Sequence, residues 1–445
     1  MRLPAVKIAF IGAGSARFST RIITDLCLQP GLKGSAVALV EVVPGRLEAI
    51  FALAERLSQE LDVGIHFSKV INRLEALENA DFVIHCAQVG GYRWTELQRQ
   101  MEARHGYPGG AGLDQIGQAA LALEIAREME SACPHAWLIQ LASPVFESCS
   151  LVLRETTVKC IGLRHDHQVL PEIVHTLGLN PTETVAEIAG FAGWAWLIRL
   201  QTMGEDAYPR LDAWIRAQGE SHWKTCPADH PLSRTAVHLY RLLGALPLAS
   251  GTRWPSWWYQ DKADLAGLEG GADEEAAWQS HREALGAAVA RVEQAAFDFS
   301  RPVSSVFPGN SSQDQVVPVI NALSGGAAGL FQVSIPNGGP ILADFPEDLA
   351  IECPAAVSEL GVHPLAVAPI TSRLKAGAMV PRWNQAERMI QALRSRERND
   401  LLLYLLADHR TKSIDQAQEL LDEWFSEPRN TTLAQSFLGR RFRRS

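Results

Sequence analysis

The sequence predicts an α/β protein: a doubly wound parallel sheet over residues 1–165, followed by a helix-rich α+β region over residues 166–445. Short apolar runs alternate with helical patterns through the first region, and a glycine-rich turn follows the first run. Near residue 166 the pattern changes to mainly helical segments with few strands. A chain of 445 residues is long enough to form two such domains.

Five apolar runs are expected to form the parallel strands. They read "VKIAFIG", "SAVALVEV", "DFVIHCAQV", "HAWLIQLAS" and "VKCIGL". Between them, "ARFSTRIITDLCL", "PGRLEAIFALAERLSQEL" and "GQAALALEIAREMESACP" carry apolar residues at helical spacing, and a proline ends the last segment. This repeated order of strand and helix predicts a parallel sheet with crossover helices.

The second region is expected to be helix-rich. Helical spacing recurs in "LPEIVHTLGL", "SRTAVHLYRLLGAL", "EEAAWQSHREALGAAVARVEQAAFDF" and "SIDQAQELLDEWFSE". Strands are expected only near "AAGLFQVSIPN" and "LAIECPAAV". The second domain is therefore expected to be mixed α+β, from residue 166 to residue 445.

Charge and composition argue against several classes of partner. A net charge of −9 is unfavourable for nucleic-acid or anionic-membrane binding, which needs clustered Lys and Arg. No apolar run approaches the roughly 20 residues of a membrane span. Seven scattered cysteines without a C-x-x-C pair, and an N-terminus unlike a signal peptide, predict a reduced, cytoplasmic protein.

A dinucleotide site is predicted at the first strand–helix junction. The segment "KIAFIGAGSARF" supplies a strand, then Gly12 and Gly14, then Ser15 at the expected start of a helix. The glycines let the backbone turn sharply and approach a pyrophosphate, although Arg17 replaces the third glycine of the usual fingerprint. Glu41 ends the second strand, where a carboxylate accepts hydrogen bonds from an adenosine ribose and rejects a 2′-phosphate, so NAD is favoured over NADP.

A second cofactor contact is predicted at "CAQVGGY". Gln88 and Gly90 follow a buried strand there, and ligands of open α/β sheets bind at the carboxyl ends of strands. These two residues are expected to flank the nicotinamide ribose.

The stretch "CIGLRHDHQ", residues 160–168, has three open interpretations. His165 and His167 share one face of an extended segment, so their spacing permits two ligands of a metal site. Imidazole also titrates near neutral pH, so His165 could move a proton. The histidines could also be incidental to the end of a strand.

The chain resembles glycoside hydrolase family 4, the NAD-dependent glycosidases, collinearly over nearly its whole length. The residues that carry the resemblance are "KIAFIGAGSARF", "QVGGYRWTE", "VKCIGLRH", "WLIRLQTMGEDAYP" and "SIPNGGPILADFPEDLAIECPAAV". The resemblance implies a Rossmann domain of lactate and malate dehydrogenase type, NAD as cofactor, a sugar or glycoside as substrate, and a homodimer or homotetramer.

The resemblance also implies a reaction that differs from the usual two-carboxylate scheme. Hydride passes from sugar C3 to NAD, a base removes the acidified C2 proton, and the C1 leaving group is eliminated. Water then adds at C1 and the steps reverse. In the family a metal such as Mn²⁺ polarises the C2 and C3 oxygens.

The residues expected to hold that metal and to act as that base differ in this chain. Arg164 stands where the family has a cysteine ligand, and Ala192 and Gly193 stand where it has asparagine and histidine. Trp257 occupies the place of the tyrosine base, which Tyr259 could fill if the register slips by two. No metal ligand is therefore predicted.

Two further segments depart from the family pattern. Ser143 replaces the asparagine that contacts substrate and keeps only a hydroxyl. The segment "PGGAGLDQIGQ", residues 108–118, replaces a longer loop that contains arginine. Ser143, Trp257 and Tyr259 are retained as the expected substrate contacts.

Three functions follow from these features. The first is an NAD-dependent glycosidase-like enzyme in which the Arg164 guanidinium replaces the metal, His165 is the acid or base, and Asp166 orients them. The second is a catalytically silent NAD-binding relative, a sensor or partner subunit. The third is an NAD-dependent hydroxy-acid or polyol dehydrogenase, with Arg164 on a carboxylate and His165 on a hydroxyl.

Overall fold

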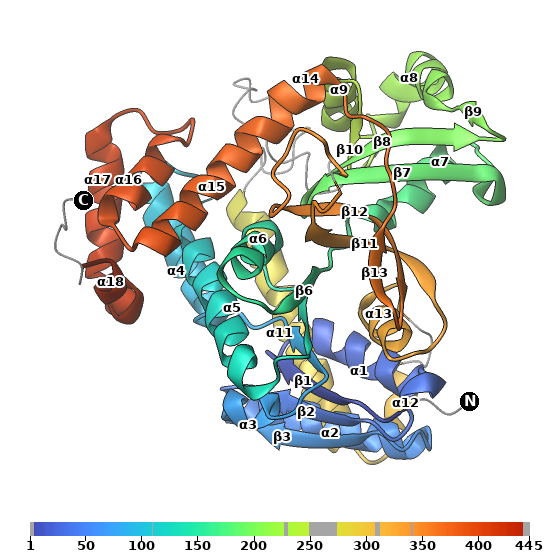
Figure 1. Ribbon diagram of the computed structural model, residues 1–445, viewed down its shortest axis with the longest axis vertical. Helices are drawn as coiled ribbons and strands as arrows, with labels where there is room; N and C mark the ends of the chain where they lie inside the picture. Colours follow the sequence, from blue (N-terminus) through green and yellow to red (C-terminus); the bar gives the residue numbers. More distant parts are fainter. Residues whose placement is uncertain are drawn as a thin grey trace.

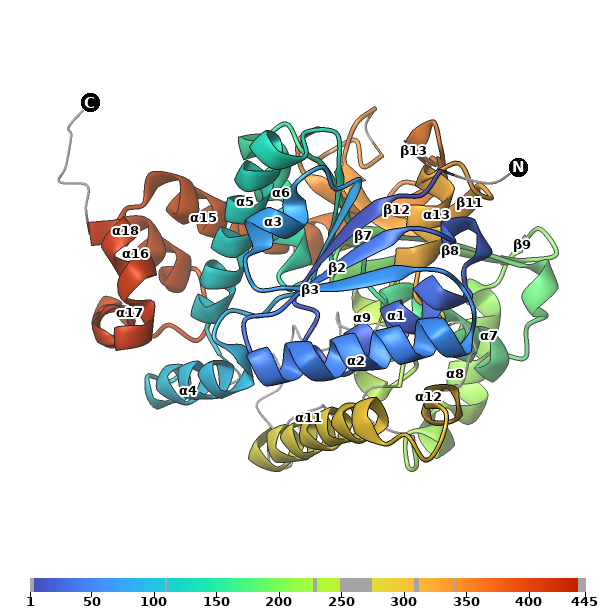
Figure 2. The ribbon, with the colours of Figure 1, turned by 90° about the horizontal axis from the view of Figure 1, so that it is seen from below.

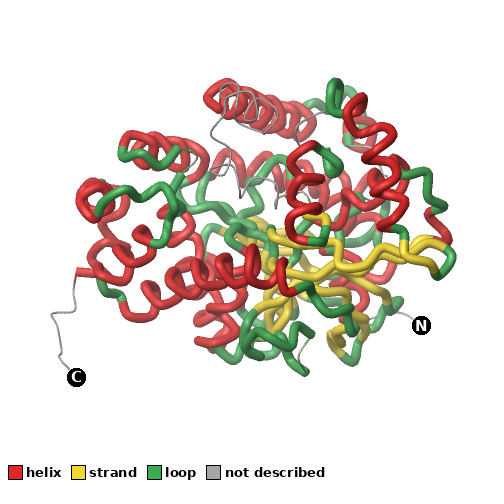
Figure 3. Tube along the Cα trace, turned by 90° about the horizontal axis from the view of Figure 1, so that it is seen from above, coloured by secondary structure: helices red, strands yellow, loops and turns green. Residues whose placement is uncertain are grey.

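A computed structural model describes residues 4–108, 110–226, 230–248, 274–307, 312–339 and 341–438 (Figure 1). One mixed sheet runs through the molecule in the order β10-β8-β7-β12-β11-β6-β5-β4-β1-β2-β3. Helices pack around this sheet, as the trace coloured by secondary structure shows (Figure 3). The predicted α/β class, with a helix-rich second half, is confirmed.

The first half of the chain forms the parallel part of the sheet. Its strands are β1 (Lys7–Ile11), β2 (Ala36–Val40), β3 (His66–Val70), β4 (Phe82–His85), β5 (Trp137–Gln140) and β6 (Lys159–Gly162). Neighbouring strands pair in parallel, in the spatial order 3-2-1-4-5-6. That order is typical of dinucleotide-binding sheets, and it places a crevice where the order reverses between β1 and β4.

The edge strand β3 was not among the five predicted runs. Its sequence "HFSKV" buries only Phe67, because one side of the strand has no neighbour. The five predicted runs are almost entirely buried and therefore continuous in apolar residues, whereas an edge strand can remain polar.

Helices cover both faces of the parallel sheet. They are α1 (Phe18–Leu28), α2 (Pro44–Glu60), α3 (Arg73–Leu77), α4 (Gly91–Arg104), α5 (Leu113–Ala132) and α6 (Val145–Glu155). Figure 2 shows α1 and α2 on one side of the strands, and α3, α5 and α6 on the other. Crossover helices on both faces are what a doubly wound sheet requires.

The long helix α11 (Glu274–Phe297) lies outside α2 (Figure 2). The Arg56 guanidinium of α2 donates to the carbonyl oxygens of Ala295 and Asp298 at 2.7 and 2.9 Å. The Glu60 carboxylate accepts the backbone N–H of Val303, at the start of the short helix α12 (Val303–Val306), at 2.8 Å. One face of α2 thus supplies partners for the end of one helix and the beginning of the next.

The second half extends the sheet with antiparallel strands. They are β7 (Thr184–Phe191), β8 (Trp194–Thr202), β9 (Glu205–Asp206), β10 (Leu246–Pro247), β11 (Gly329–Pro336), β12 (Ala350–Ser358) and β13 (Gly361–Pro364). The two halves join where Ser334 of β11 pairs with Gly162 of β6. Strands β11 and β12 confirm the two strands expected in this region, whereas β7 and β8 were not predicted.

The remaining helices surround the antiparallel strands and the outer face of α4 and α5. They are η2 (Asp166–Val169), α7 (Leu170–Thr176), α8 (Tyr208–His222), α9 (Arg234–Leu243), α13 (Val316–Leu323), α15 (Val380–Ser395), α16 (Arg398–Leu406), α17 (Ile414–Ser426) and α18 (Thr431–Leu438). Helices α15 to α18 share a buried apolar core with α4 and α5 that includes Tyr107, Tyr404 and Trp424.

The C-terminal helices also hold the connection between α4 and α5. The Arg410 guanidinium donates to the carbonyl oxygens of Pro108 and Gly110 at 2.6 and 2.9 Å. The Tyr404 hydroxyl donates to Ala111 O at 3.2 Å. From within α4, the Glu102 carboxylate accepts the backbone N–H of Leu113 at 3.2 Å and so caps the start of α5.

Across the described ranges, none of the helices combines the length and the apolar character that a membrane crossing requires.

Candidate active site

The side chains predicted from the sequence gather at the carboxyl edge of the parallel strands. Gly12 follows β1, Glu41 follows β2, Gln88 follows β4, Ser143 follows β5 and Arg164 follows β6. Because the strands are parallel, their carboxyl ends meet at one edge, beside the crevice between β1 and β4.

The turn after β1 is built for close approach of the backbone. Gly12 has φ +91°, and a Cβ atom there would lie 2.3 Å from Ala87 N, so only glycine fits. The Gly14 N–H donates to Glu41 Oε2 at 3.0 Å, and the same carboxylate accepts the Val43 N–H at 3.0 Å. Glu41 therefore links the glycine turn to the end of β2.

Helix α1 begins later than the sequence predicted. It starts at Phe18 rather than at Ser15, and Ser15 O accepts the Ser19 N–H at 2.9 Å in the turn before it. Arg17, at the position of the third glycine, is the residue before the helix and is exposed. The wider turn results because residues 12–14 must first clear the end of β4 at Ala87.

Gln88 and Gly90 lie in the segment between β4 and α4. The Gln88 side chain is exposed, and its amide donates to Thr95 Oγ1 at 2.7 Å. Gly90 has φ +69° and immediately precedes α4, where a Cβ atom would lie 2.5 Å from the Trp94 ring. Both residues are thus fixed by the first turns of α4.

Arg164 lies between Ser143 and Asp166. Its Nη1 donates to Ser143 Oγ at 3.3 Å, and its Nη2 is 3.9 Å from Asp166 Oδ1. The side chain is 29% exposed, so the guanidinium is accessible from the crevice. A Cβ atom on Gly193 would lie 3.9 Å from Arg164 Nη2, which brings together the two positions where the family has metal ligands.

Asp166 is buried and holds the turn between β7 and β8. Its Oδ2 accepts the Gly193 N–H at 2.9 Å. Gly193 has φ +81°, which favours glycine in this turn. Asp166 therefore joins the end of β6 to the β7–β8 hairpin.

His165 is paired with a carboxylate that the sequence did not suggest. Its Nε2 is 2.8 Å from Asp314 Oδ1, and its ring lies 5.9 Å from the Phe18 ring. His165 is 32% exposed and Asp314 is buried. With Nε2–H directed to Asp314, the lone pair falls on Nδ1.

Asp314 is itself fixed by α1. Its backbone N–H donates to Ser312 Oγ at 3.1 Å, and the Ser312 N–H donates to the buried Asp25 of α1 at 2.7 Å. The Ser312 hydroxyl also donates to Asp25. His165 is thus held through Asp314 and Ser312 by the helix that opens at the glycine turn.

His167 does not join His165 as a ligand pair. Burial and the neighbouring His165 lower the pKa of His167 to about 4, and its Nδ1 has no hydrogen-bond partner in the part of the chain that the structure describes. A neutral, half-buried imidazole three residues after Arg164 is a structural side chain in this arrangement.

The two positions at which the resemblance implies metal ligands, Arg164 and Gly193, offer no side-chain lone pair to a metal ion. A guanidinium has no lone pair to offer, and glycine has no side chain. His165 directs one nitrogen to Asp314. Within the described ranges, no three histidine, cysteine, aspartate or glutamate side chains come close enough to hold a metal ion.

Two acidic residues at this edge of the sheet, Asp314 and Glu352, were not predicted from the sequence. Asp314 lies in a polar loop, "SSQDQ", where a single aspartate carries no signal. Glu352 is the one charged residue of the otherwise apolar strand β12, where it is 2% exposed. A single acidic residue in an otherwise apolar strand is unusual, so the sequence alone could have marked Glu352 as a candidate site residue. The expected contacts Trp257 and Tyr259 lie outside the described residues.

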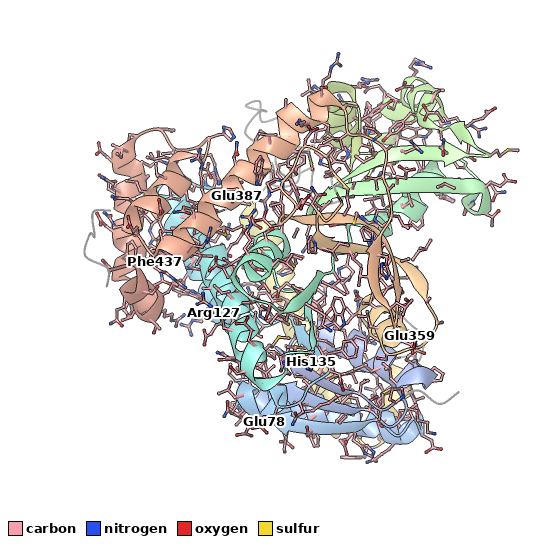
Figure 4. The ribbon with its side chains drawn as sticks, viewed as in Figure 1. Glu78, Arg127, His135, Glu359, Glu387 and Phe437 are labelled. Atoms are coloured by element: carbon pink, nitrogen blue, oxygen red, sulfur yellow. The ribbon has the colours of Figure 1, made fainter. Side chains whose placement is uncertain are left out.

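A groove of about 1030 Å³ between α3, α5 and α18 lies elsewhere. Glu78, Arg127 and Phe437, which Figure 4 labels, mark its surroundings on the outer side of α5, where Glu78 and Arg127 are among its lining residues. None of the predicted site residues lines it. Chemistry is therefore assigned to the carboxyl edge of the strands rather than to this groove.

Comparison with known proteins agrees with the fold. The first half matches the model described as Family 4 glycosyl hydrolase over residues 7–179, and the second half matches Family 4 glycosyl hydrolase C-terminal domain over residues 188–411. The chain is 31% identical over 215 residues to an alpha-galactosidase of Bacillus subtilis (strain 168), covering 46% of this chain and 50% of that protein. It is 30% identical over 162 residues to a 6-phospho-beta-glucosidase of Escherichia coli (strain K12), covering 35% of this chain and 36% of that protein.

The chain thus aligns with about half, or less, of the length of these curated relatives. Two solved structures share the fold over nearly the whole chain. A 6-phospho-alpha-glucosidase from gut microorganisms, in complex with NAD and glucose-6-phosphate, has a TM-score of 0.77 at 17% identity, covering 96% of this chain and 98% of that one. A 6-phospho-beta glucosidase from Thermotoga maritima, with manganese, NAD⁺ and glucose-6-phosphate, has a TM-score of 0.74 at 15% identity, covering 95% and 98%.

These structures support the fold alone, whereas the family models match both halves of the sequence. The second model by itself spans half of the chain. The resemblance read from the sequence motifs is confirmed, and the protein belongs to family 4 of the glycosyl hydrolases.

Proposed function

We propose that this chain is an NAD-dependent glycosidase-like enzyme that oxidises a sugar or glycoside transiently at C3, with Arg164 in place of the usual metal ion. The observation that carries the proposal is the position of the Arg164 guanidinium, beside Ser143, Asp166 and Gly193 at the dinucleotide crevice. Family membership supports the reaction type, and relatives are named as alpha-galactosidase and 6-phospho-beta-glucosidase.

The crevice fits NAD. Gly12 leaves no room for a side chain, so a pyrophosphate can approach the backbone before α1. The Glu41 carboxylate at the end of β2 is a ribose acceptor and repels a 2′-phosphate. Gln88 and Gly90 border the nicotinamide side. When bound, NAD supplies the hydride acceptor that the oxidation of a sugar hydroxyl requires.

Arg164 acts as a fixed cation on the oxygens of the sugar. Oxidation at C3 and loss of the C2 proton place negative charge on those oxygens, and a guanidinium stabilises it without changing its own protonation. Ser143 and Asp166 orient the guanidinium. The Ser143 hydroxyl can also contact the substrate, because it lies beside Arg164 at the end of β5.

His165 moves a proton at the same edge. The Asp314 carboxylate orients the ring, so that Nδ1 faces away from Asp314 and can take or return a proton at a substrate oxygen. The C2 base is a separate group, and Tyr259 is retained as the proposed base, with Trp257 as a proposed sugar contact. Both assignments rest on the sequence alone.

The same pair of side chains favours a second function. An arginine beside a histidine can bind the carboxylate and the hydroxyl of a 2-hydroxy acid, as a simple NAD-dependent dehydrogenase would require. A catalytically silent NAD-binding sensor or subunit is the third function. A homodimer or homotetramer and a cytoplasmic location stay predictions from the sequence.

Isotope exchange distinguishes these functions. The protein is incubated in deuterated water with NAD and a panel of glycosides, 6-phosphoglycosides and sugar acids, and products are analysed for deuterium at C2. Exchange at C2 is expected, and it should persist with a chelator and gain nothing from Mn²⁺. Net NADH would support the dehydrogenase, whereas NAD binding without exchange or NADH would support the silent relative. Activity that a chelator abolishes and Mn²⁺ restores would contradict the role given to Arg164.

A further inference from the structure

Glu352 is a buried acid in the centre of the sheet, directly behind the candidate site. It pairs with Gly190 of β7 on one side and with Ser334 of β11 on the other. Ser334 in turn pairs with Gly162, the last residue of β6. Directly opposed residues share one face of a sheet, so Glu352 lies on the same face as Gly162, two residues before Arg164.

The charged groups that face Glu352 come from the turn after β6. They are Asp166 and Arg164, while the adjacent strands contribute Gly190, Ser334 and Gln332, none of which is charged. Within the described ranges, neither carboxyl oxygen of Glu352 has a hydrogen-bond donor in good geometry.

Two neighbouring groups are engaged elsewhere. The Gln332 amide lies alongside Glu352 but donates to Ile188 O at 3.1 Å. Glu147, in the first turn of α6, is another buried acid, but it is bound to Arg382 at 2.6 Å. Glu352 therefore shares its counter-charge with Asp166, so that two buried carboxyl groups face one guanidinium.

A proton on Glu352 removes one of these two charges. A second buried carboxylate beside Asp166 is costly away from water, and among the described residues neither oxygen of Glu352 has a hydrogen-bond donor to offset that cost. Burial and the Asp166 carboxylate raise the pKa of Glu352 well above its usual range, in spite of Arg164 and Gln332. Asp166, by contrast, accepts the Gly193 N–H.

We propose that Glu352 is a positioning residue that stays protonated in the resting enzyme, so that Asp166 holds Arg164 at Ser143 without competition from a second buried carboxylate. Deprotonation of Glu352 would add a second negative charge behind the guanidinium and draw it from the crevice into the sheet. The consequence for turnover rests on the proposed function, whereas the protonation itself does not.

The test is Glu352→Gln in the full chain, because glutamine imitates the neutral acid. Infrared spectroscopy at neutral pH is expected to show the C=O stretch of a protonated carboxylic acid that is lost in E352Q. Unfolding by denaturant is measured in parallel from neutral to alkaline pH. A raised pKa gives stability that is present at low pH and lost as pH rises, so the wild type should lose more stability than E352Q.

Glu147→Gln is the matched control, because it replaces another buried glutamate that is charged and paired with Arg382. E147Q should be less stable than the wild type at neutral pH. If E352Q is destabilised in the same way and the infrared band is unchanged, Glu352 is a carboxylate and the proposal is wrong.

Turnover separates this proposal from the proposed function. If exchange at C2 is observed, its alkaline decline should shift to higher pH in E352Q, which a merely structural residue would not cause. If no sugar is turned over, the proposed function fails, while the infrared band and the stability profile still decide whether Glu352 holds a proton.

Discussion

In the proposed function, the Arg164 guanidinium takes the place of a metal ion at the scale of a single residue. Its charge belongs to a side chain, so it needs partners that hold it in position. Ser143 and Asp166 supply them. Gly193, the second position at which the resemblance implies a metal ligand, places no side chain beside the guanidinium.

Asp314 provides a test of the proton-transfer role of His165. Asp314→Ala keeps His165 but removes the carboxylate that orients its ring. We expect C2 exchange to slow by on the order of 10²-fold, because a proton-transfer group must be held in position. The measurement is the rate of deuterium incorporation at C2.

Asp344→Ala is the control for that variant, because Asp344 is an exposed aspartate that pairs with Lys375. It should leave the exchange rate unchanged. A D314A enzyme with the wild-type rate would show that His165 acts without its carboxylate.

At the scale of elements, side chains of α2 bind the termini of two other helices. Arg56 binds carbonyl oxygens at the end of α11, and Glu60 binds N–H groups at the start of α12. Helix termini leave such groups without partners in their own helix, so these two side chains replace separate caps. Burial by itself would raise the pKa of Glu60. Hydrogen bonds from Ser304 and Val303 and the charge of Arg56 outweigh burial, so the pKa is lowered overall.

Arg56→Ala should destabilise the fold, because it removes the hydrogen bonds that Arg56 donates at the end of α11. Several carbonyl oxygens lose a charged donor at once, and hydrogen bonds to charged groups contribute about 1.5–3 kcal/mol each. We expect a loss of about 2–3 kcal/mol in the free energy of unfolding, measured by denaturant titration. Arg216→Ala, which removes an exposed arginine of α8, should change it by less than about 0.5 kcal/mol.

The sequence predicts the elements with continuous buried runs and misses those without them. Strands β1, β2, β4, β5 and β6 are nearly all buried, so their apolar runs are uninterrupted. The hairpin of β7 and β8 contains polar residues such as Glu187 and Arg199, which pair across the strands, and only Gly193 marks its turn. Its strands were therefore not distinguished from the helical segments around them.

The sequence predicts those residues of the candidate site that lie at or next to the ends of predicted strands. Gly12, Glu41, Ser143 and Arg164 all end predicted strands, so parallel topology alone brings them together. Asp314 comes from a loop about 150 positions beyond His165, a separation that periodicity and turn chemistry do not bridge. The domain boundary at residue 165 stays a prediction.

For the whole molecule, buried His85 predicts sensitivity to acid. Burial lowers the pKa of His85 to about 4 from an ordinary 6.5, against its hydrogen bond with Gln140. Because its pKa is lower in the folded state, the neutral His85 side chain contributes fully to the free energy of unfolding above pH 6.5. That contribution is lost as the pH falls towards 4. The expected loss is about 3 kcal/mol across that window.

Denaturant titrations at a series of pH values measure this loss. His85→Asn cannot titrate and should flatten the dependence between pH 6.5 and 4, whereas His135→Asn, at an exposed position before β5, should leave it unchanged. Equal slopes in wild type and H85N would assign the acid sensitivity to other groups.

The hold of Arg410 and Tyr404 on the α4–α5 connection has a consequence for the order in which the chain is made. Residues 108–111 leave the ribosome about 300 positions before the side chains that bind them. Until then the connection lacks partners for its carbonyl oxygens, and the apolar faces of α4 and α5 have no cover. The first half of the chain thus reaches its final form only after Tyr404 and Arg410 have been synthesised, which makes α4 and α5 dependent on helices made much later.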